Sequence, residues 1–328
     1  MNETVGTPAT QDSIFDLLVV GAGPTGLVCA IEAQKAGLRV VVVDKGCVCN
    51  SLFHYPSHMT FFTTPELLEI GDIPFPSPNP KPTRNEALQY YRLDIRQYHR
   101  VEKVTGSDGG FSVHTLDRFG RVALLEARKM AIATGYYDLP NYIGVLGESL
   151  SKVHHYYFDS HPFFGMDVMV VGGKNSAAIA ALELWRSGAR VTLVHRDAEL
   201  HRHVKYWIKP DIENRIKNGE IKAYFHSRVV EITLDTVVIE TPQGRETLKN
   251  DFVFAMTGYH PDFEFLEGLG IRFKGEDRQP ICNPETLESN VPGIYLAGVI
   301  VAGSRTNEIF IENGRFHGRQ IAAALMGK

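Results

Sequence analysis

The pattern of apolar and polar positions repeats one unit twice along the chain. Residues 14–45 contain an apolar strand, a glycine-rich turn, a helix rich in small residues and a second apolar strand. Residues 167–196 repeat this order. Strands that alternate with helices favour parallel sheets, so the pattern predicts an α/β protein with two nested, doubly wound, three-layer domains of the dinucleotide-binding (Rossmann-like) type.

The first turn has the spacing GxGxxG. Its glycines are Gly21, Gly23 and Gly26, and Pro24 and Thr25 lie between the last two. Glycines permit a tight turn, and a pyrophosphate then binds free backbone N–H groups at the start of the following helix. One such motif is weak evidence because glycines also serve ordinary turns. Two of them, each in register between strands, indicate two nucleotide sites.

The second turn departs from this pattern at one position. Lys174 stands where the second glycine is expected, so its side chain either displaces the pyrophosphate slightly or neutralises it. Ala177 takes the place of the third glycine. The candidate nucleotide-binding residues of this turn are Gly172, Gly173, Lys174, Asn175, Ser176 and Ala177.

The residues that end the second strand of each unit indicate which nucleotide it binds. Asp44, followed by Lys45, ends this strand in the first unit, and a carboxylate there binds a ribose diol and disfavours a 2′-phosphate. In the second unit the same place carries His195 and Arg196, with Arg202 shortly after. Cationic groups suit a 2′-phosphate, so the second site is expected to prefer NADP over NAD.

The order of the motifs predicts a split domain. Residues 14–158 and 262–328 are expected to form the first domain, with residues 159–261 inserted as the second and residues 1–13 as a flexible polar tail. Two similar phrases, ATGYYDLP and MTGYHP, each follow an apolar strand, as expected where a chain crosses between domains. They supply the candidate nucleotide-binding residues Thr134, Gly135, Thr257 and Gly258.

The last segment contains a strand, a loop and a small-residue helix that should return to the first domain. A helix that begins near Asn313 could direct its N-terminus at a cofactor and stabilise negative charge there. The alternative is a helix that only covers the sheet. Candidate cofactor contacts in this segment are Gly298, Val299, Glu312 and Asn313. Another helix is expected over residues 84–98.

Composition excludes several classes of protein. A net charge of −4 over 328 residues, with no basic run among aromatic residues, gives no sign of nucleic-acid binding. Apolar stretches fall short of the roughly 20 residues that span a bilayer. The four cysteines form neither a disulfide framework nor a zinc pattern, so a cytoplasmic protein without a metal site is expected.

The cysteines leave one question open. Cys29 falls in the helix after the first turn and is expected to be a buried, small apolar residue. Cys47 and Cys49 lie just beyond Asp44, near the adenosine end of the first nucleotide. They are either redox-active or incidental loop thiols.

Together these motifs resemble the flavoproteins with two dinucleotide domains that include the low-molecular-weight thioredoxin reductases. The resemblance covers nearly the whole chain, and it implies a thioredoxin-reductase-like fold, FAD in the split domain, NADPH in the inserted domain and a homodimer. It rests on the first GxGxxG, Asp44, Ala133 to Gly135, Gly172 to Ala177, His195 and Arg196, Thr257 and Gly258, and GIYLAG at Gly293 to Gly298.

Departures from that family narrow the resemblance. The segment HYYFD, residues 155–159, stands where thioredoxin reductases carry CxxCD, and Val299 replaces the usual aspartate after LAG. With the phrases YPSHMTFFTTPELLEIGDIPF, TRNEALQYY and IFIENGRFHG, these departures resemble the bacillithiol disulfide reductases of the YpdA type. Those enzymes are taken to reduce bacillithiol disulfide with NADPH and FAD. They typically carry a cysteine in the first turn, where this chain has Thr25.

The resemblance implies transfer of electrons from NADPH through FAD to a small-molecule disulfide or a small electron-carrier protein. His54, Tyr55 and His155 are candidate catalytic residues beside the flavin, because a histidine there could protonate a departing thiolate. Exposed or capped histidines are the alternative interpretation. Three other functions remain open: a ferredoxin or flavodoxin NADP reductase, a flavin monooxygenase, and a non-catalytic flavin redox sensor.

Overall fold

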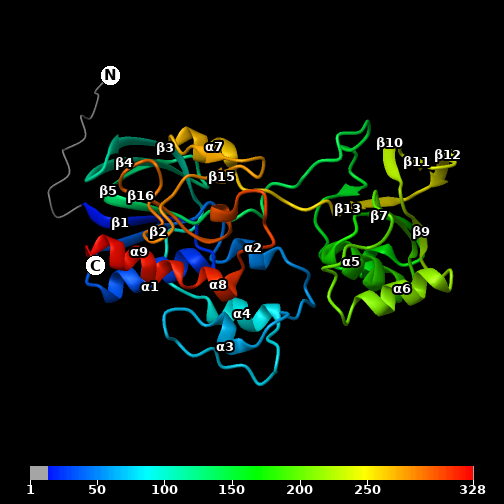
Figure 1. The fold of residues 1–328 in the computed structure, drawn as a ribbon, viewed down its shortest axis with the longest axis horizontal. Helices are drawn as coiled ribbons and strands as arrows, with labels where there is room; N and C mark the ends of the chain where they lie inside the picture. Colours follow the sequence, from blue (N-terminus) through cyan, green and yellow to red (C-terminus); the bar gives the residue numbers. More distant parts are fainter. Residues whose placement is uncertain (1–13, 328) are drawn as a thin grey trace. The chain divides into compact units, whose positions relative to one another are not determined.

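The computed structural model describes residues 14–327, so the predicted tail over residues 1–13 lies outside the described residues. The chain forms two compact units (Figure 1). The first contains the described residues up to Phe53, the segment Met59–Leu139 and the described residues from Tyr259 onward. The second contains His54–His58 and Pro140–Gly258.

The sheet of the first unit combines parallel and antiparallel strands in the order β2-β1-β5-β4-β3, with β16 also beside β5. β1, β2, β5 and β16 are mutually parallel, whereas β3 and β4 form an antiparallel extension. The strands are β1 (Phe15–Val20), β2 (Val40–Val43), β3 (His99–Ser107), β4 (Gly110–Asp117), β5 (Val122–Ile132) and β16 (Ile294–Leu296). A separate pair is formed by β14 (Phe273–Lys274) and β15 (Gln279–Pro280).

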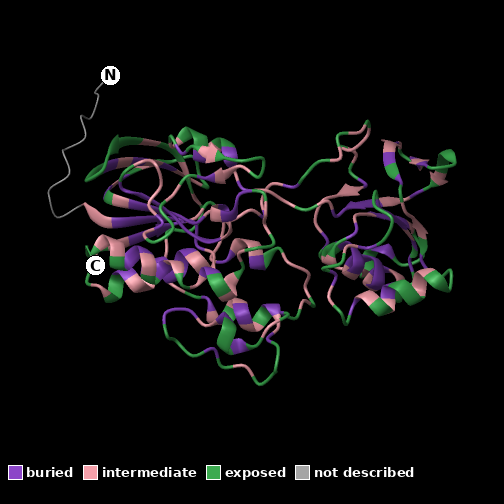
Figure 2. Cartoon of the chain, in the orientation of Figure 1, coloured by how far each residue is buried: buried purple, intermediate pink, exposed green. Residues whose placement is uncertain are grey.

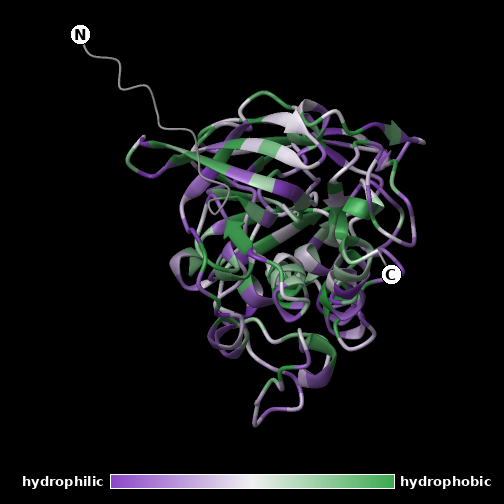
Figure 3. Cartoon of the chain, turned by 90° about the vertical axis from the view of Figure 1, so that its left-hand side faces the viewer, coloured by the Kyte–Doolittle hydropathy of each residue, from purple (hydrophilic) through white to green (hydrophobic). Residues whose placement is uncertain are grey.

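Burial along these strands follows their place in the sheet. β1 is buried over its last four residues, as expected for a parallel strand covered on both faces, whereas β4 alternates between buried and less buried positions. Figure 2 shows the buried strand segments, and Figure 3 shows hydrophobic and hydrophilic segments following one another along the strands of this unit.

Two helices, α1 (Pro24–Lys35) and α9 (His317–Leu325), lie side by side against this sheet (Figure 1). Small residues allow the close approach: a Cβ added at Gly318 would lie 2.7 Å from the carbonyl oxygen of Val28. The remaining helices of this unit are α2 (Asn50–Phe53), α3 (Pro65–Leu68), α4 (Arg84–Tyr90), α7 (Phe263–Gly268), the 3₁₀ helix η3 (Gly298–Ala302) and α8 (Ile311–Gly314).

The second unit has a wholly parallel five-stranded sheet in the order β6-β13-β7-β8-β9, covered by the helices α5 (Asn175–Arg186) and α6 (Lys209–Lys217). Its strands are β6 (Val153–His154), β7 (Asp167–Val171), β8 (Arg190–Val194), β9 (Lys222–Tyr224) and β13 (Phe252–Ala255). An antiparallel sheet of β10 (Arg228–Ile232), β11 (Thr236–Thr241) and β12 (Gly244–Lys249) and the 3₁₀ helix η2 (His161–Phe163) complete it. The predicted α/β class with two dinucleotide-type domains is confirmed.

The compact units divide the chain at different residues from the predicted domains. Residues 140–158 fall in the second unit because β6 pairs with β13, which places Val153 beside Val253. The segment His54–His58 also falls there: the N–H of Ser57 donates to the carbonyl of Phe158 at 3.0 Å. Pairings between segments so far apart in sequence leave no local signal at the boundary.

Two helices also differ from the prediction. The helix expected over residues 84–98 ends at Tyr90, because the chain beyond it runs along the edge of β2, where the N–H of Arg96 donates to the carbonyl of Val42 at 2.9 Å. The helix expected to begin near Asn313 is divided into α8, which begins at Ile311, and α9, which begins at His317.

Candidate functional site

The first glycine-rich turn is shaped by its neighbours at two glycines and open at the third. Gly21 has φ +104°, and a Cβ there would lie 2.3 Å from the carbonyl oxygen of Ala133. A Cβ at Gly26 would lie 1.9 Å from the carbonyl oxygen of Gly21. At Gly23 a Cβ would meet no described atom within 4 Å. The backbone before Pro24 is therefore open to a pyrophosphate at the start of α1.

Asp44 is fixed beside this turn. Its Oδ2 accepts a hydrogen bond from the N–H of Ala22 at 2.6 Å, and its Oδ1 accepts one from the N–H of Gly46 at 2.7 Å. Burial raises the pKa of the Asp44 carboxyl, while these two hydrogen bonds act in the opposite direction. The adjacent Lys45 pairs with Asp138 at 2.8 Å. The carboxylate expected to bind a ribose thus lies against the turn that would hold the pyrophosphate.

Thr134 and Gly135 follow the C-terminal end of β5, next to the same turn. The Oγ1 of Thr134 is buried and has no hydrogen-bond partner among the described residues. An orphaned hydroxyl is uncommon in a protein interior, and a bound ligand is one way to satisfy it. This hydroxyl and the open space at Gly23 both fit a dinucleotide in the first unit.

Thr25 lies between two glycines of the C-terminal segment. A Cβ at Gly298 would lie 3.2 Å from Thr25 Oγ1, and a Cβ at Gly314 would lie 3.1 Å from it. Val299 follows Gly298 in η3 and is partly buried. The three segments that contain Thr25, Gly298 and Gly314 therefore meet at the N-terminus of α1.

Sequence reasoning missed His317, which holds the turn at Gly298. Its Nδ1 accepts a hydrogen bond from the N–H of Gly298 at 2.9 Å, so a proton on the neutral ring is carried by Nε2. Burial lowers the pKa of His317, which favours this neutral form. The phrase FHG gives no local hint of this role, because the partner lies nineteen positions earlier.

Glu312 and Asn313 both lie in the short helix α8. The side chain of Asn313 braces this helix, since its Oδ1 accepts from the N–H of Phe310 at 2.7 Å and its Nδ2 donates to the carbonyl of Glu308 at 2.8 Å. Asn313 is therefore committed to shaping its own segment. Glu312 is partly buried.

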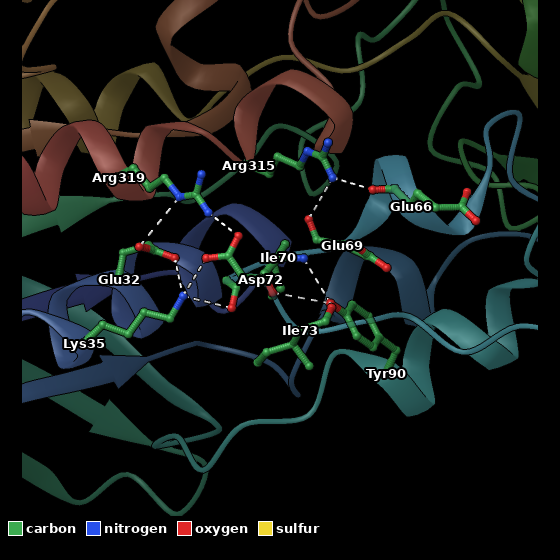
Figure 4. Close-up of polar contacts among 11 residues, drawn as sticks. Glu32, Lys35, Glu66, Glu69, Ile70, Asp72, Ile73, Tyr90, Arg315 and Arg319 are labelled. Atoms are coloured by element: carbon green, nitrogen blue, oxygen red, sulfur yellow. Dashed lines mark hydrogen bonds and ion pairs between the residues drawn. The ribbon is translucent and has the colours of Figure 1, made fainter.

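Two arginines fasten the α8–α9 segment to residues 65–72, which comprise α3 and the loop after it (Figure 4). Arg315 Nη1 donates to the carbonyls of Glu66 at 2.5 Å and Glu69 at 3.2 Å. Arg319 pairs with Asp72, and this lowers the pKa of the Asp72 carboxyl. Bonds from side chains to backbone carbonyls fix the path of a segment, so residues 65–72 have a structural partner in the C-terminal helices.

The second glycine-rich turn is tight and partly filled. Gly172 has φ +145°, and a Cβ there would lie 2.5 Å from the carbonyl oxygen of Met256 and 3.0 Å from the Cβ of Ala177. A Cβ at Gly173 would lie 2.2 Å from Nε2 of His195, so the imidazole ring covers this glycine. The carbonyl of Gly173 accepts from the N–H of His201 at 2.9 Å.

Other predicted residues of this turn divide into two groups. Asn175 braces a loop: its Oδ1 accepts from the N–H of Lys205 at 2.9 Å, and its Nδ2 donates to the carbonyl of His203 at 3.2 Å. Four further predicted residues of the second unit are exposed: Lys174 and Ser176 on the turn, and Arg196 and Arg202 beyond the end of β8.

His195 is buried rather than presented to solvent, with 8% of its surface exposed. Its Nε2 lies 3.2 Å from Oδ2 of Asp197, a carboxylate that sequence reasoning did not single out. Burial lowers the pKa of His195, and Asp197 raises it to a lesser extent. The strand end therefore offers one buried imidazole, one exposed guanidinium at Arg196 and one exposed carboxylate.

The three predicted catalytic residues all lie in the second unit. His54 is exposed and Tyr55 is partly buried. His155 is mostly buried, with Nε2 3.8 Å from Oε1 of Glu148 and its ring edge-on to Tyr142 at 4.9 Å between centroids. Their catalytic role beside the flavin stays a prediction.

Thr257 and Gly258 end the second unit where the chain leaves it. Thr257 Oγ1 donates to the carbonyl of Asn141 at 2.5 Å, and the carbonyl of Gly258 accepts from the N–H of Asn141 at 2.9 Å. Gly258 has φ +89°, a conformation that favours glycine. These two residues are therefore engaged in joining the two crossing segments.

None of the four cysteines has the surroundings of a reactive thiol. Cys29 and Cys49 are fully buried, and burial raises the pKa of Cys29 to about 12 and that of Cys49 well above its ordinary value. Burial, with Asp44 nearby, also raises the pKa of Cys47. Burial raises the pKa of Cys282, which packs partly buried against the core of the first unit. Thiolates, not thiols, attack disulfides, so these residues are poor nucleophiles.

The geometry shows two glycine-rich turns of the dinucleotide-binding type, and comparison with known proteins identifies the chain as an oxidoreductase. The chain belongs to the pyridine nucleotide-disulphide oxidoreductase family, whose model matches residues 18–298. It is 47% identical over 316 residues to bacilliredoxin reductase Bdr of Bacillus subtilis (strain 168), covering 94% of this chain and 96% of that protein.

Solved structures give the same placement. The structure of bacillithiol disulfide reductase Bdr (YpdA) from Bacillus cereus matches with a TM-score of 0.93 and 46% identity, covering 95% of this chain and 99% of that one. Thioredoxin reductase from T. acidophilum, 23% identical, matches with a TM-score of 0.74 over 96% of this chain and 98% of that one, which supports the fold alone. The resemblance to YpdA-type proteins is confirmed. Along the described part of the chain, no helix is long and apolar enough to cross a membrane.

Proposed function

We propose that this protein is an NADPH-dependent flavoenzyme that reduces bacillithiol disulfide or a closely related small disulfide. The observation that carries the proposal is the joint presence of two dinucleotide turns and 46% identity to a protein named as a bacillithiol disulfide reductase, over nearly the whole of both chains. A flavin monooxygenase or a carrier reductase has no comparable support, and neither does a non-catalytic sensor.

The first unit would hold FAD. The open backbone at Gly23 would take the pyrophosphate, Asp44 the ribose, and the Thr134 hydroxyl would gain the partner that it otherwise lacks. When bound, FAD accepts a hydride from a nicotinamide and supplies the electron pair that cleaves a disulfide. Around it, His317 holds Gly298 in place through the backbone N–H.

The second unit would hold NADPH. Its pyrophosphate would meet the start of α5, and the exposed cations Lys174, Arg196 and Arg202 would attract the phosphates. His195 has a supporting part, since its buried ring covers Gly173 and shapes the floor of the turn.

The electrons would reach the disulfide without a protein thiol. The chain has four cysteines, all with raised pKa values, and Thr25 has a hydroxyl that cannot take part in thiol exchange. For each NADPH oxidised, one proton is taken up, one disulfide is cleaved and two thiols are released.

The test is steady-state oxidation of NADPH by FAD-loaded protein with bacillithiol disulfide as the varied substrate, while released thiols are counted. The proposal predicts disulfide-dependent turnover with two thiols for each NADPH. Turnover that requires ferredoxin, or that yields hydrogen peroxide whether or not the disulfide is present, would contradict it.

A second acceptor has one specific observation in its favour. The Bacillus subtilis relative is named a bacilliredoxin reductase, which indicates a small protein disulfide as its partner. The same assay with a bacilliredoxin carrying a mixed disulfide distinguishes the two acceptors.

A homodimer and a cytoplasmic location remain predictions. Light scattering tests the homodimer, and the free state of the four cysteines is consistent with the cytoplasmic location.

A further inference from the structure

The end of β8 carries a carboxylate in the place where the proposed function needs cations. Asp197 stands three residues beyond Val194, and its Oδ2 lies 3.2 Å from Nε2 of His195. The same imidazole ring also covers the glycine-rich turn, because a Cβ at Gly173 would lie 2.2 Å from Nε2 of His195. Only one imidazole ring therefore separates the carboxylate from the glycine turn that would bind the dinucleotide.

The backbone holds Asp197 in this position. Its carbonyl accepts from the N–H of His226 at 3.0 Å, and the flanking residue His195 donates its N–H to the carbonyl of Tyr224 at 2.8 Å and accepts from the N–H of Ser227 at 3.0 Å. Tyr224 ends β9, the neighbouring strand, and His226 and Ser227 follow it directly. The backbone of Asp197 is thus fixed by main-chain hydrogen bonds, while its side chain is 61% exposed and contacts Nε2 of His195.

The residues that follow β8 carry charges of both signs. Arg196 is exposed beside Asp197. Burial lowers the pKa of His201, the nearby Lys174, His203 and Arg202 lower it further, and Asp197 acts in the opposite sense. NADPH differs from NADH by a 2′-phosphate with close to two negative charges. A carboxylate at a strand end repels that phosphate and accepts a hydrogen bond from the ribose hydroxyl of NADH.

We infer that Asp197 is a specificity-determining residue. It lowers the preference of the second unit for NADPH over NADH, so that this unit also accepts NADH. The inference rests on the proposed nicotinamide nucleotide site of the second unit. It concerns which nucleotide is bound, and it is independent of which disulfide or carrier receives the electrons.

The substitution Asp197→Asn tests this inference, because it keeps the shape of the side chain and removes its charge. The probes are 2′,5′-ADP and 5′-AMP, which differ by the 2′-phosphate alone, and their Kd values are measured by calorimetry on the full chain. We expect Asp197→Asn to raise the preference for 2′,5′-ADP by about three- to tenfold over the native chain. The ratio of kcat/KM for NADPH to that for NADH should rise by a similar factor.

Glu199→Gln is the matched control, since Glu199 is an exposed carboxylate on the same loop and its removal changes the net charge equally. We expect this variant to keep the native ratio. A second variant, Asp197→Ser, should reproduce the shift of Asp197→Asn without the amide. An unchanged ratio in both Asp197 variants, or an equal shift in Glu199→Gln, would overturn the inference.

These outcomes separate the inference from the proposed function. Nucleotide Kd values can shift as expected in a protein that reduces no disulfide, which would reject the proposed function alone. Conversely, disulfide turnover with an unchanged Kd ratio would reject the role of Asp197 alone.

Discussion

At the scale of the residue, two glycines of the first turn, Gly23 and Gly21, differ in whether they can accommodate a Cβ, so alanine substitutions at the two positions should have different effects on stability. Gly23 has φ −70°, and a Cβ there meets open space. We therefore expect Gly23→Ala to leave the free energy of unfolding within about 0.5 kcal/mol of the native value, while the new methyl group occupies the room of the pyrophosphate and lowers FAD content. Flavin absorbance per chain and thermal unfolding of the apoprotein measure the two effects.

Gly21→Ala is the matched comparison. Gly21 combines φ +104° with a backbone oxygen 2.3 Å from the site of a Cβ, so both strain and overlap oppose the substitution. We expect the apoprotein to lose at least about 2 kcal/mol of stability. Equal stability in the two variants would show that the turn is less constrained than its geometry indicates.

Thr25 gives a second prediction at this scale. It is the second residue of α1, and a thiol at a helix N-terminus has a lowered pKa. We expect Thr25→Cys to form a mixed disulfide with bacillithiol during turnover, detected as a mass increase of the intact protein under denaturing, alkylating conditions. The native chain and a Cys47→Ser variant should show no such adduct and similar rates. An adduct on a native cysteine would contradict transfer without a protein thiol.

At the scale of the element, helix α4 depends on a reciprocal cap. The N–H and Oγ1 of Thr83 both donate to Oε2 of Glu86 at 2.7 Å, while the N–H of Glu86 donates to Thr83 Oγ1 at 3.3 Å. Ser77, in the loop between α3 and α4, also donates to this carboxylate, at 2.7 Å. These hydrogen bonds lower the pKa of Glu86 to about 2.

The cap predicts a stability change with a defined pH window. Because the folded pKa of Glu86 is lowered, its contribution is present above the unfolded value, roughly 4.3, and is lost as pH falls toward the folded value of about 2. We expect Glu86→Gln to lose about 0.5–1 kcal/mol at neutral pH. Urea unfolding should show this deficit shrinking through the acid window, and a deficit that is constant with pH would argue against the cap.

Elements also show which features the sequence can predict. The two strand–turn–helix–strand units are local, so glycine spacing and hydrophobic runs predicted β1, α1 and β2 as well as β7, α5 and β8. α4 was predicted too long because the residues after Tyr90 contact the edge of β2, a non-local pairing. The split between α8 and α9 had no clear signal, since glycine and histidine at that point serve distant partners such as Gly298.

At the scale of the whole molecule, the division into two units and the α/β class followed from the repeated pattern, while the boundaries did not. They depend on pairings between distant segments, as of β6 with β13 and of Ser57 with Phe158. Contacts between distant segments also explain why only part of the candidate site could be predicted from the sequence. Asp44 and the glycines are marked by local motifs, but His317 and Asp197 gain their importance only from neighbours that the fold brings to them.

We propose that electrons pass from NADPH through FAD to a small disulfide without a protein thiol. The most direct measurement is an anaerobic single turnover, in which NADPH bleaches the flavin and bacillithiol disulfide is then added. The account predicts that the oxidised flavin spectrum returns, with two thiols released for each flavin and no mass adduct on the protein. A flavin that stays reduced until ferredoxin, a quinone or oxygen is supplied would contradict the account.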